Sequence, residues 1–251
     1  MLTSVRSLMA ATVLAGCALT ATPALADDSP ISLSANVALV TDYRFRGIGL
    51  SGGDPAIQGG FDLSTSPGFY VGTWASSINS PDNGYGDMEL DLYGGWSGTV
   101  TNGLDADIGL YWYVYPTNVA PLINAGAGGA DYYEIYASLS PTFGPVSAKF
   151  GVNYAPGQDS LDFGGKRDNL YLYGNADIAI PMTPITVSGH VGYTDGSLTY
   201  TADSKAWDYS IGASVSFMEH FSLGVSYIGV DGPSISGVTD GTVVGTLSAS
   251  F

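Results

Sequence analysis

The chain has 251 residues, of which 45% are hydrophobic, a length and composition that suit one large domain. Acidic residues outnumber basic ones by 23 to 7, which gives a formal net charge of −16 and argues against nucleic acid as a partner. After the first 26 residues no run of about 18 apolar residues occurs, which excludes a transmembrane helix from the rest of the sequence. A closed barrel is then the remaining way to cross a membrane, because it pairs all its backbone groups internally.

Residues 1–26 have the features of an export signal. Arg6 supplies positive charge, Leu8 to Leu19 form an apolar core, and Ala24-Leu25-Ala26 is a small-x-small cleavage site. An alternative is a lipobox, Leu14-Ala15-Gly16-Cys17, with cleavage before the cysteine and attachment of lipid to it. We predict cleavage after Ala26, which leaves six basic residues against 23 acidic ones and no cysteine in the mature chain. Either route takes the chain out of the cytoplasm.

The mature sequence alternates apolar and polar residues in one segment after another. The first stretch runs from Ile31 to Gly49, and its apolar face ends in Tyr43 and Phe45. Because a strand points alternate side chains to opposite faces, this period of two predicts strands. Eleven further segments of the same kind follow, separated by turn-forming residues. They are Ala56–Thr65, Phe69–Ser76, Met88–Ser97, Leu104–Tyr115, Tyr132–Ser140, Val146–Ala155, Asn169–Ile180, Ile185–Thr194, Trp207–Phe217, Phe221–Val230 and Thr242–Phe251.

Aromatic residues mark both ends of the predicted strands on their apolar face. At the long-loop end they are Tyr43, Phe45, Trp112, Tyr133, Tyr154, Tyr193, Trp207 and Tyr227, and at the other end Phe69, Trp96, Phe217, Phe221 and Phe251. Two aromatic belts around an apolar band are typical of outer-membrane barrels. A secreted sandwich or soluble barrel shares the strand spacing, but its polar residues face outward. Here the polar residues lie on the face opposite the belts, which favours the membrane barrel.

The connections between the predicted strands alternate between long and short. In an up-and-down barrel, this order places the short turns at one rim, with both chain termini, and the long loops at the other. We therefore predict that residues 27–251 form an all-β, up-and-down antiparallel transmembrane β-barrel of 12 strands. The expected location is the outer membrane of a Gram-negative bacterium.

Three segments resemble the TorF-type porin family of Gram-negative bacteria. They are Val40-Thr41-Asp42-Tyr43-Arg44-Phe45-Arg46-Gly47, the stretch Gly68 to Ser77, and Glu89-Leu90-Asp91-Leu92-Tyr93-Gly94-Gly95. The resemblance covers essentially the whole mature chain and departs at Gly49, where we expect the family motif to carry a serine. It implies an outer-membrane location and a pore, but it supplies no substrate and no roles for single residues.

The inner face predicted by strand parity carries most of the candidate site residues. Its acidic members are Asp42, Asp62, Glu89, Asp91, Asp105, Asp107, Glu134, Asp177 and Asp208; its other members are Arg44, Arg46, Lys149, His190, Tyr93, Tyr111, Tyr113, Tyr115, Tyr132, Tyr136, Tyr171 and Tyr173. We expect Arg44 and Arg46 to form a charged element on the wall, facing carboxylates such as Asp42, Asp62, Glu89 and Asp91. These residues could line a solute path, or they could fill the interior and close it. Twelve strands lie between the narrow barrels that side chains fill and the 16- to 18-stranded barrels that hold a channel.

The favoured function is passive diffusion of small hydrophilic solutes, with a preference for cations and no cofactor, metal or covalent chemistry. The alternatives are an outer-membrane barrel enzyme of the hydrolase type and a structural or adhesive barrel without flux. Gly47 to Gly52 fits a dinucleotide-binding pattern and Gly49 to Gly53 a nucleophile elbow, but both require a following helix, and a strand is predicted instead. The expected partners are membrane lipid, the solute and the barrel-assembly machinery; the pattern leaves the oligomeric state open.

Phe251 is predicted to act as an assembly signal, because it ends the last strand on the same face as Val243 and Leu247. Deleting Phe251 is expected to reduce the amount of inserted protein while signal cleavage continues. Quantifying the folded barrel in outer-membrane fractions tests this, and normal insertion of the truncated chain would contradict it.

Overall fold

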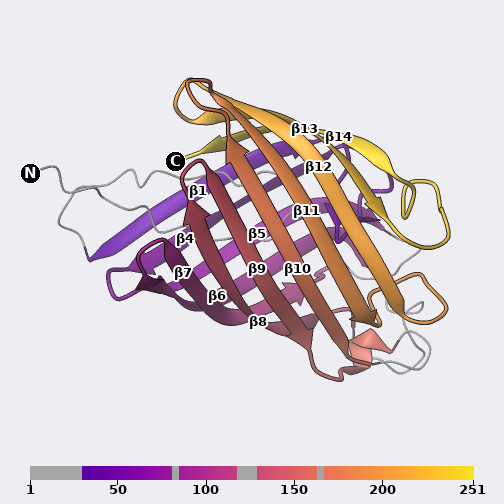
Figure 1. Cartoon of the computed structure of the whole chain (residues 1–251). Coiled ribbons are helices and arrows are strands. Elements are labelled where there is room, and N and C mark those ends of the chain that lie inside the picture. The colour runs from indigo at the N-terminus through magenta and orange to yellow at the C-terminus, as the bar shows by residue number, and fades with distance from the viewer. Residues whose placement is uncertain (1–29, 81–84, 118–128, 163–166) are drawn as a thin grey trace, which may run out of the picture.

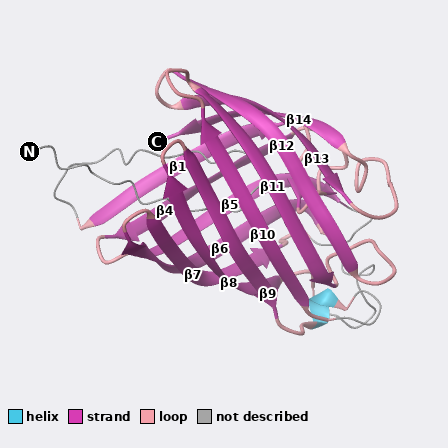
Figure 2. Ribbon diagram, in the orientation of Figure 1, coloured by secondary structure: helices cyan, strands magenta, loops and turns pink. Residues whose placement is uncertain are grey.

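The computed structural model describes residues 30–80, 85–117, 129–162 and 167–251, so the predicted signal segment lies outside the described residues. Antiparallel strands close into one barrel, in which each strand pairs with its neighbours in sequence and β1 pairs with β14 (Figures 1 and 2). The strands of the barrel are β1 (Ile31–Val40), β4 (Ala56–Thr65), β5 (Phe69–Ser80), β6 (Gly86–Thr101), β7 (Leu104–Val114), β8 (Tyr132–Phe143), β9 (Val146–Ala155), β10 (Asn169–Ala179), β11 (Ile185–Gly196), β12 (Lys205–Phe217), β13 (Phe221–Val230) and β14 (Thr242–Ser250). The prediction of an up-and-down barrel of 12 strands is confirmed.

The register joins the ends of the sheet without a break in its apolar outer face. Leu39 lies opposite Ile57 on one side and Leu247 on the other, so one row of aliphatic side chains crosses the closure between β1 and β14. Further along, Ile211 of β12 is 64% exposed, although it is large and apolar. Such a surface needs an apolar surrounding, as in the hydrocarbon region of a bilayer.

Both aromatic belts are present, with two exceptions at the first strand. Trp112 and Trp207 are exposed at the long-loop end, and Phe69 and Phe221 at the short-turn end. The start of β1 and the C-terminus lie on the short-turn side in Figure 1, as the alternation of loop lengths predicts. Within the described ranges, no helix is long and apolar enough to cross a membrane; the short 3-10 helix η2 (Asp159–Leu161) lies between β9 and β10.

The exceptions arise because the first strand leaves the barrel wall earlier than predicted. β1 ends at Val40, and the chain then turns inward through the short strands β2 (Arg44–Phe45) and β3 (Ile48–Gly49), which pair with each other. The turn between them is left-handed, with φ of 50° at Arg46 and 80° at Gly47. The outward placement predicted for Tyr43 and Phe45 is therefore wrong. The hairpin is extended like the strand before it, so the period of two continues past the point where the chain leaves the wall.

The two faces of β12 allow a matched test at one depth. Ile211 points outward and the adjacent Ser210 points inward, where it is half-buried. We expect Ile211→Arg to destabilise the inserted barrel by about 2–4 kcal/mol, because the charge would lie in lipid near the middle of the membrane. Ser210→Arg should cost much less, since the lumen is polar. Denaturant unfolding in lipid vesicles measures both, and equal costs would contradict the assignment of faces.

Candidate functional site

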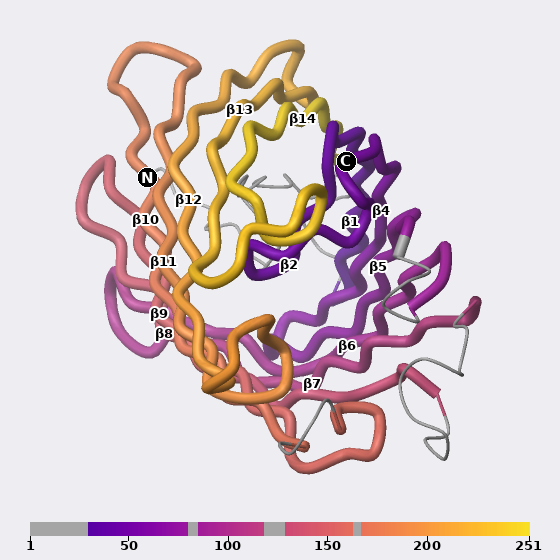
Figure 3. The backbone as a smooth tube through the Cα atoms, turned by 90° about the vertical axis from the view of Figure 1, so that its right-hand side faces the viewer, coloured from indigo at the N-terminus to yellow at the C-terminus, as the bar shows by residue number. Residues whose placement is uncertain are grey.

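A hairpin of this chain crosses the long-loop half of the barrel lumen. We call residues 41–55 the lumen hairpin; Figure 3 shows β2 inside the ring of strands, next to the loop between β13 and β14. On one side the backbone N–H of Asn79, in β5, donates to the carbonyl of Leu50 at 2.9 Å. Gly47 lies so close to β12 and β13 that an added Cβ atom would meet Asp208 and Val230. The hairpin thus contacts wall strands on several sides.

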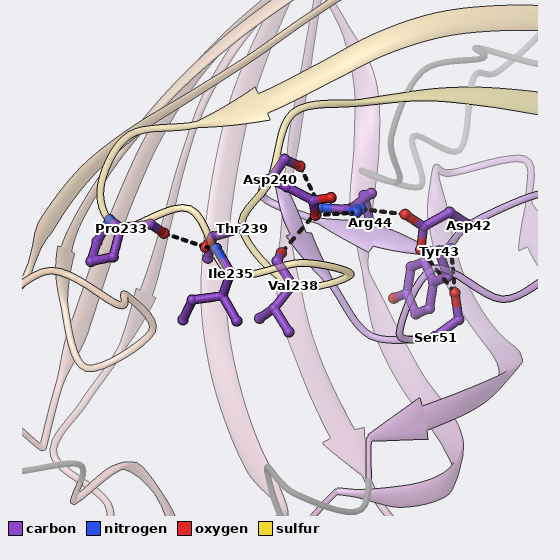
Figure 4. A network of polar contacts seen from close by, with 9 residues as sticks. All are labelled: Asp42, Tyr43, Arg44, Ser51, Pro233, Ile235, Val238, Thr239 and Asp240. Carbon is purple, nitrogen blue, oxygen red and sulfur yellow. Dashed lines mark hydrogen bonds and ion pairs between the residues drawn. The ribbon is translucent and has the colours of Figure 1, made fainter.

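Arg44 ties the lumen hairpin to the loop of residues 231–241 (Figure 4). Its Nε donates to Asp42 Oδ2 at 2.6 Å, its Nη1 donates to the carbonyls of Val238 and Asp240 at 3.1 and 2.9 Å, and its Nη2 donates to Asp240 Oδ1 at 3.0 Å. Ser51 Oγ donates to the other oxygen of Asp42 at 3.0 Å. Arg44 is only 2% exposed, and these acceptors compensate for taking its charge out of water.

Arg46 binds the opposite wall through a fork of two hydrogen bonds. Nη1 and Nη2 lie 2.9 and 2.6 Å from the two carboxylate oxygens of Glu134, which is fully buried in β8. Tyr113 and Asn153 donate to Glu134 Oε2 at 3.2 and 3.0 Å. The guanidinium also lies 4.1 Å from the ring centroid of Tyr171, a cation–π contact. Parallel N–H donors on a carboxylate give geometric selectivity for a guanidinium.

Tyr43 fixes the side of the hairpin that faces β5 and β6. Its hydroxyl donates to Glu89 Oε1 at 2.8 Å, and its ring meets the ring of Trp74 at 5.6 Å between centroids. Phe45 packs on Tyr113, with centroids 5.5 Å apart. The two aromatic residues predicted to face lipid therefore hold the hairpin inside the barrel.

The inner wall next to the hairpin and toward the short turns carries tyrosine–carboxylate pairs. Tyr93 donates to Asp62 and Tyr70 donates to Asp107, both at 2.6 Å. Tyr111 donates to Asp91 Oδ2 at 3.1 Å, and its ring stacks on that of Tyr93 at 5.0 Å between centroids. Each of these carboxylates thus accepts a hydrogen bond from a neutral tyrosine, and Asp107 also interacts electrostatically with Lys149.

Several inward tyrosines lie flat against the wall because a glycine of the neighbouring strand leaves room. A Cβ at Gly151 would collide with the ring of Tyr173, and a Cβ at Gly72 would collide with that of Tyr93. The register places each glycine directly opposite its tyrosine. The rings therefore cover the wall and project less into the lumen.

His190 lies among polar partners on the inner face at mid-height. Its Nε2 is 2.8 Å from Asp208 Oδ1 and 2.9 Å from the hydroxyl of Tyr171, and its Nδ1 is 2.5 Å from Asn175 Oδ1. Because Tyr171 also stacks with Arg46, this cluster adjoins the tip of the lumen hairpin. The side chain of His190 remains 20% exposed, so it borders accessible space.

The two halves of the lumen differ in how much of the wall remains accessible. Next to the hairpin, inward side chains such as Trp74, Tyr132 and Glu134 are buried. Toward the short turns, many inward side chains are half-buried and small or polar. They include Ser32, Ser34, Ser64, Ser140, Ser147, Lys149, Asp177, Thr186, Ser188 and Ser214. Side chains are therefore packed against the hairpin at the long-loop end, whereas accessible hydroxyl and charged groups line the other end.

The structure places the predicted acidic and aromatic residues of the barrel strands on the inner face. It separates Arg44 and Arg46 from the wall, since both belong to the lumen hairpin. The expected set of facing carboxylates is correct for Asp42 with Arg44, but the other partners are Asp240 and Glu134. Asp62, Glu89 and Asp91 bind tyrosines instead. Sequence parity put both arginines on one extended strand and so missed the contacts made across the lumen.

Several residues of the site were not singled out from the sequence. Asp240 lies in a Gly-rich loop that gives no sign of pairing with a residue near the start of the mature chain. Trp74 and Tyr70 follow the strand parity of β5 and could have been assigned to the inner face from it. The sequence Arg46-Gly47 was also an available turn signal, because glycine favours the left-handed backbone.

Comparison with known proteins gives a family and a fold. Residues 24–251 match the family described as "Bacterial protein of unknown function (Gcw_chp)". Among solved structures, the KdgM porin in complex with oligogalacturonate aligns with a TM-score of 0.55 and 9% identity, covering 87% of this chain and 97% of that one. The NanC porin aligns with a TM-score of 0.56 and 11% identity, covering 87% and 98%.

A third similar structure is the COG4313 outer-membrane channel of Pseudomonas putida F1. It has a TM-score of 0.52 and 11% identity, and the alignment covers 91% of this chain and 98% of that one. No curated protein matches the sequence. At these identities the three structures establish the similarity of fold.

The close packing of Tyr173 on Gly151 predicts that the barrel requires a glycine at position 151. Gly151→Ala is expected to destabilise the barrel by about 1–3 kcal/mol, because the new methyl group forces Tyr173 off the wall. Gly189→Ala is the matched control, since a Cβ there meets no atom within 4 Å. Urea unfolding of detergent-folded protein measures both. Equal stability of the two variants would contradict the close packing of Tyr173 on Gly151.

Proposed function

The chain belongs to the Gcw_chp family of bacterial proteins of unknown function, and we propose that it is a porin-like channel of the Gram-negative outer membrane. Small hydrophilic solutes pass through it by diffusion. The observation that carries this proposal is the combination of an apolar outer band with a polar inner face that remains accessible from the short-turn end to mid-height. That combination is the one found in membrane barrels that conduct solutes.

The features of the two chain ends support export and insertion. Residues 1–26 would be removed as a signal after Ala26, with the lipobox at Cys17 as the alternative route. Phe251 would be read by the barrel-assembly machinery, and the aromatic belts would contact membrane lipid. The long loops, with the lumen hairpin, would then face outward from the cell. The motif from Val40 to Gly47 supports a relationship to the TorF-type porins.

A preference for cations follows from how the lumen charges are paired. Both arginines of the lumen hairpin form ion pairs, Arg44 with Asp42 and Asp240 and Arg46 with Glu134. In the described part of the chain, five further inner-face carboxylates have no ion pair with a basic side chain: Asp62, Glu89, Asp91, Asp105 and Asp177. Asp107 interacts electrostatically with Lys149. A passage with low-dielectric walls and excess negative charge concentrates cations.

A hydrolase function receives less support from the lumen than a channel does. The one inward histidine, His190, contacts Tyr171, Asn175 and Asp208, and these partners include no serine or cysteine nucleophile. The three similar structures are likewise described as porins or as a channel. A structural or adhesive barrel without flux remains the other alternative, and conductance distinguishes it.

Reversal potentials in a salt gradient across a planar bilayer test the proposed selectivity. We expect stepwise conductance with a cation-selective sign, which weakens as salt shortens the screening length from about 10 Å at 0.1 M. The double variant Asp105→Asn and Asp177→Asn should reduce the selectivity, because both carboxylates lie on the inner face and remain accessible. Leu92→Met, on the lipid face, is the control. Anion selectivity would refute the acidic-lumen argument, and absence of conductance would refute the channel.

A further inference from the structure

We propose that Arg46 is a tethered occupant of a guanidinium-binding site in the lumen wall, and that the free site takes solutes that carry a guanidinium group. The wall of this site consists of Glu134, Tyr113, Asn153 and Tyr171, from strands β7 to β10. Guanidinium binding would identify a solute class for the proposed channel, and its role in transport rests on that proposed function. The binding itself can be tested without flux.

The geometry of the wall is specific for a planar cation with paired donors. Glu134 presents both carboxylate oxygens to Nη1 and Nη2 of Arg46, at 2.9 and 2.6 Å. Tyr113 and Asn153 orient this carboxylate from neighbouring strands through bonds to Oε2. Tyr171 offers the face of its ring to the same guanidinium at 4.1 Å. A compact ammonium ion could use the charge but not the fork or the stacking surface.

Arg46 leaves part of this region unsatisfied, which points to a ligand other than the hairpin. Within the described residues, the buried atoms Nε of Arg46, Oδ1 of Asn153 and Oδ2 of Asp208 have no hydrogen-bond partner. Asp208 accepts from the hydroxyl of Tyr171, so it belongs to the wall next to the stacked ring. Buried polar atoms are normally paired. The wall therefore offers more acceptors than the side chain of Arg46 uses.

The occupant belongs to a segment that is not part of the barrel's own hydrogen-bond ladder. Arg46 lies at the tip of the lumen hairpin, where its own backbone is left-handed, a conformation that side chains other than glycine rarely adopt. Glu134, by contrast, lies on β8, which is paired along its length with β7 and β9. Displacement of the hairpin tip would leave the wall site intact and turned toward the lumen.

The ligand class follows from the occupant itself. A solute that carries a guanidinium on a flexible chain, such as free arginine, can reproduce the two bonds to Glu134 and the contact with Tyr171. It can also direct further N–H groups to acceptors that Arg46 does not reach. Citrulline has nearly the same shape but no charge, which makes it the matched probe.

The test is calorimetric titration of free arginine into detergent-folded protein. Arg46→Ala empties the site and should bind arginine at least about tenfold more tightly than the unaltered protein, in which Arg46 competes. Citrulline should not bind at the same concentrations. In the double variant Arg46→Ala with Glu134→Gln, arginine binding should weaken by about tenfold or more, because the charged acceptor is lost.

Folding of each variant is checked by its heat-modifiable migration on gels. If Arg46→Ala does not fold, Arg46→Gln removes the guanidinium while keeping the methylene stem of the side chain, and the same outcomes apply to it. Equal binding of arginine and citrulline, or an unchanged affinity after Glu134→Gln, would overturn the proposal. Bilayer recordings of the same proteins separate the two hypotheses. Arginine binding without conductance would refute the channel and keep the site, whereas conductance without arginine binding would do the reverse.

Discussion

The architecture depends on closing a sheet inside an apolar medium. A backbone N–H or C=O that faces lipid finds no water, so each strand must be paired on both sides. β1 and β14 complete the ring through the register from Asn36 opposite Ser250 to Val40 opposite Thr246. The bonds between Ala35 and Phe251 extend this pairing to the last residue of the chain. Once the ring is closed, the period of two assigns one face of every strand to lipid and the other to the lumen.

Burial of two arginines is the second constraint. Desolvation of a guanidinium is costly, and removing the partner of a buried ion typically costs about 3–5 kcal/mol. The lumen hairpin meets this constraint by taking acceptors from distant parts of the fold: Asp240 and Val238 for Arg44, and Glu134 for Arg46. Other inner-face carboxylates accept hydrogen bonds from hydroxyl groups, those of tyrosines above all. The long-loop half of the lumen is consequently a network of paired charges, while the other half keeps accessible polar groups.

The strands could be predicted from sequence because their signal is local. Alternation and turn residues located β4, β9 and β13 at the residues where the structure has them, and placed the other strands within a few residues, except for β1, which ends at Val40 and not at Gly49. The hairpin could not be located by the same signal, since Tyr43 and Phe45 continue the alternation after the strand has ended. The partners of the arginines were missed for another reason. No local pattern links Arg46 to Glu134 or Arg44 to Asp240, because these contacts depend on the curvature and closure of the sheet. The inward direction of Asp62, Glu89 and Asp91 could be predicted, because it follows from strand parity alone.

The contact between Arg44 and Asp240 also constrains the order of folding. The two residues are separated by 196 positions in the sequence, so this contact closes one of the longest loops in the protein. Loop closure of this length is entropically unfavourable until intervening strands have paired. The acceptors on residues 231–241 lie between β13 and β14, so they are in place only when these last two strands have paired. The ion pair thus forms as a late step that reports completion of the ring, and a chain lacking its final hairpin would leave an arginine in the interior without its carboxylate.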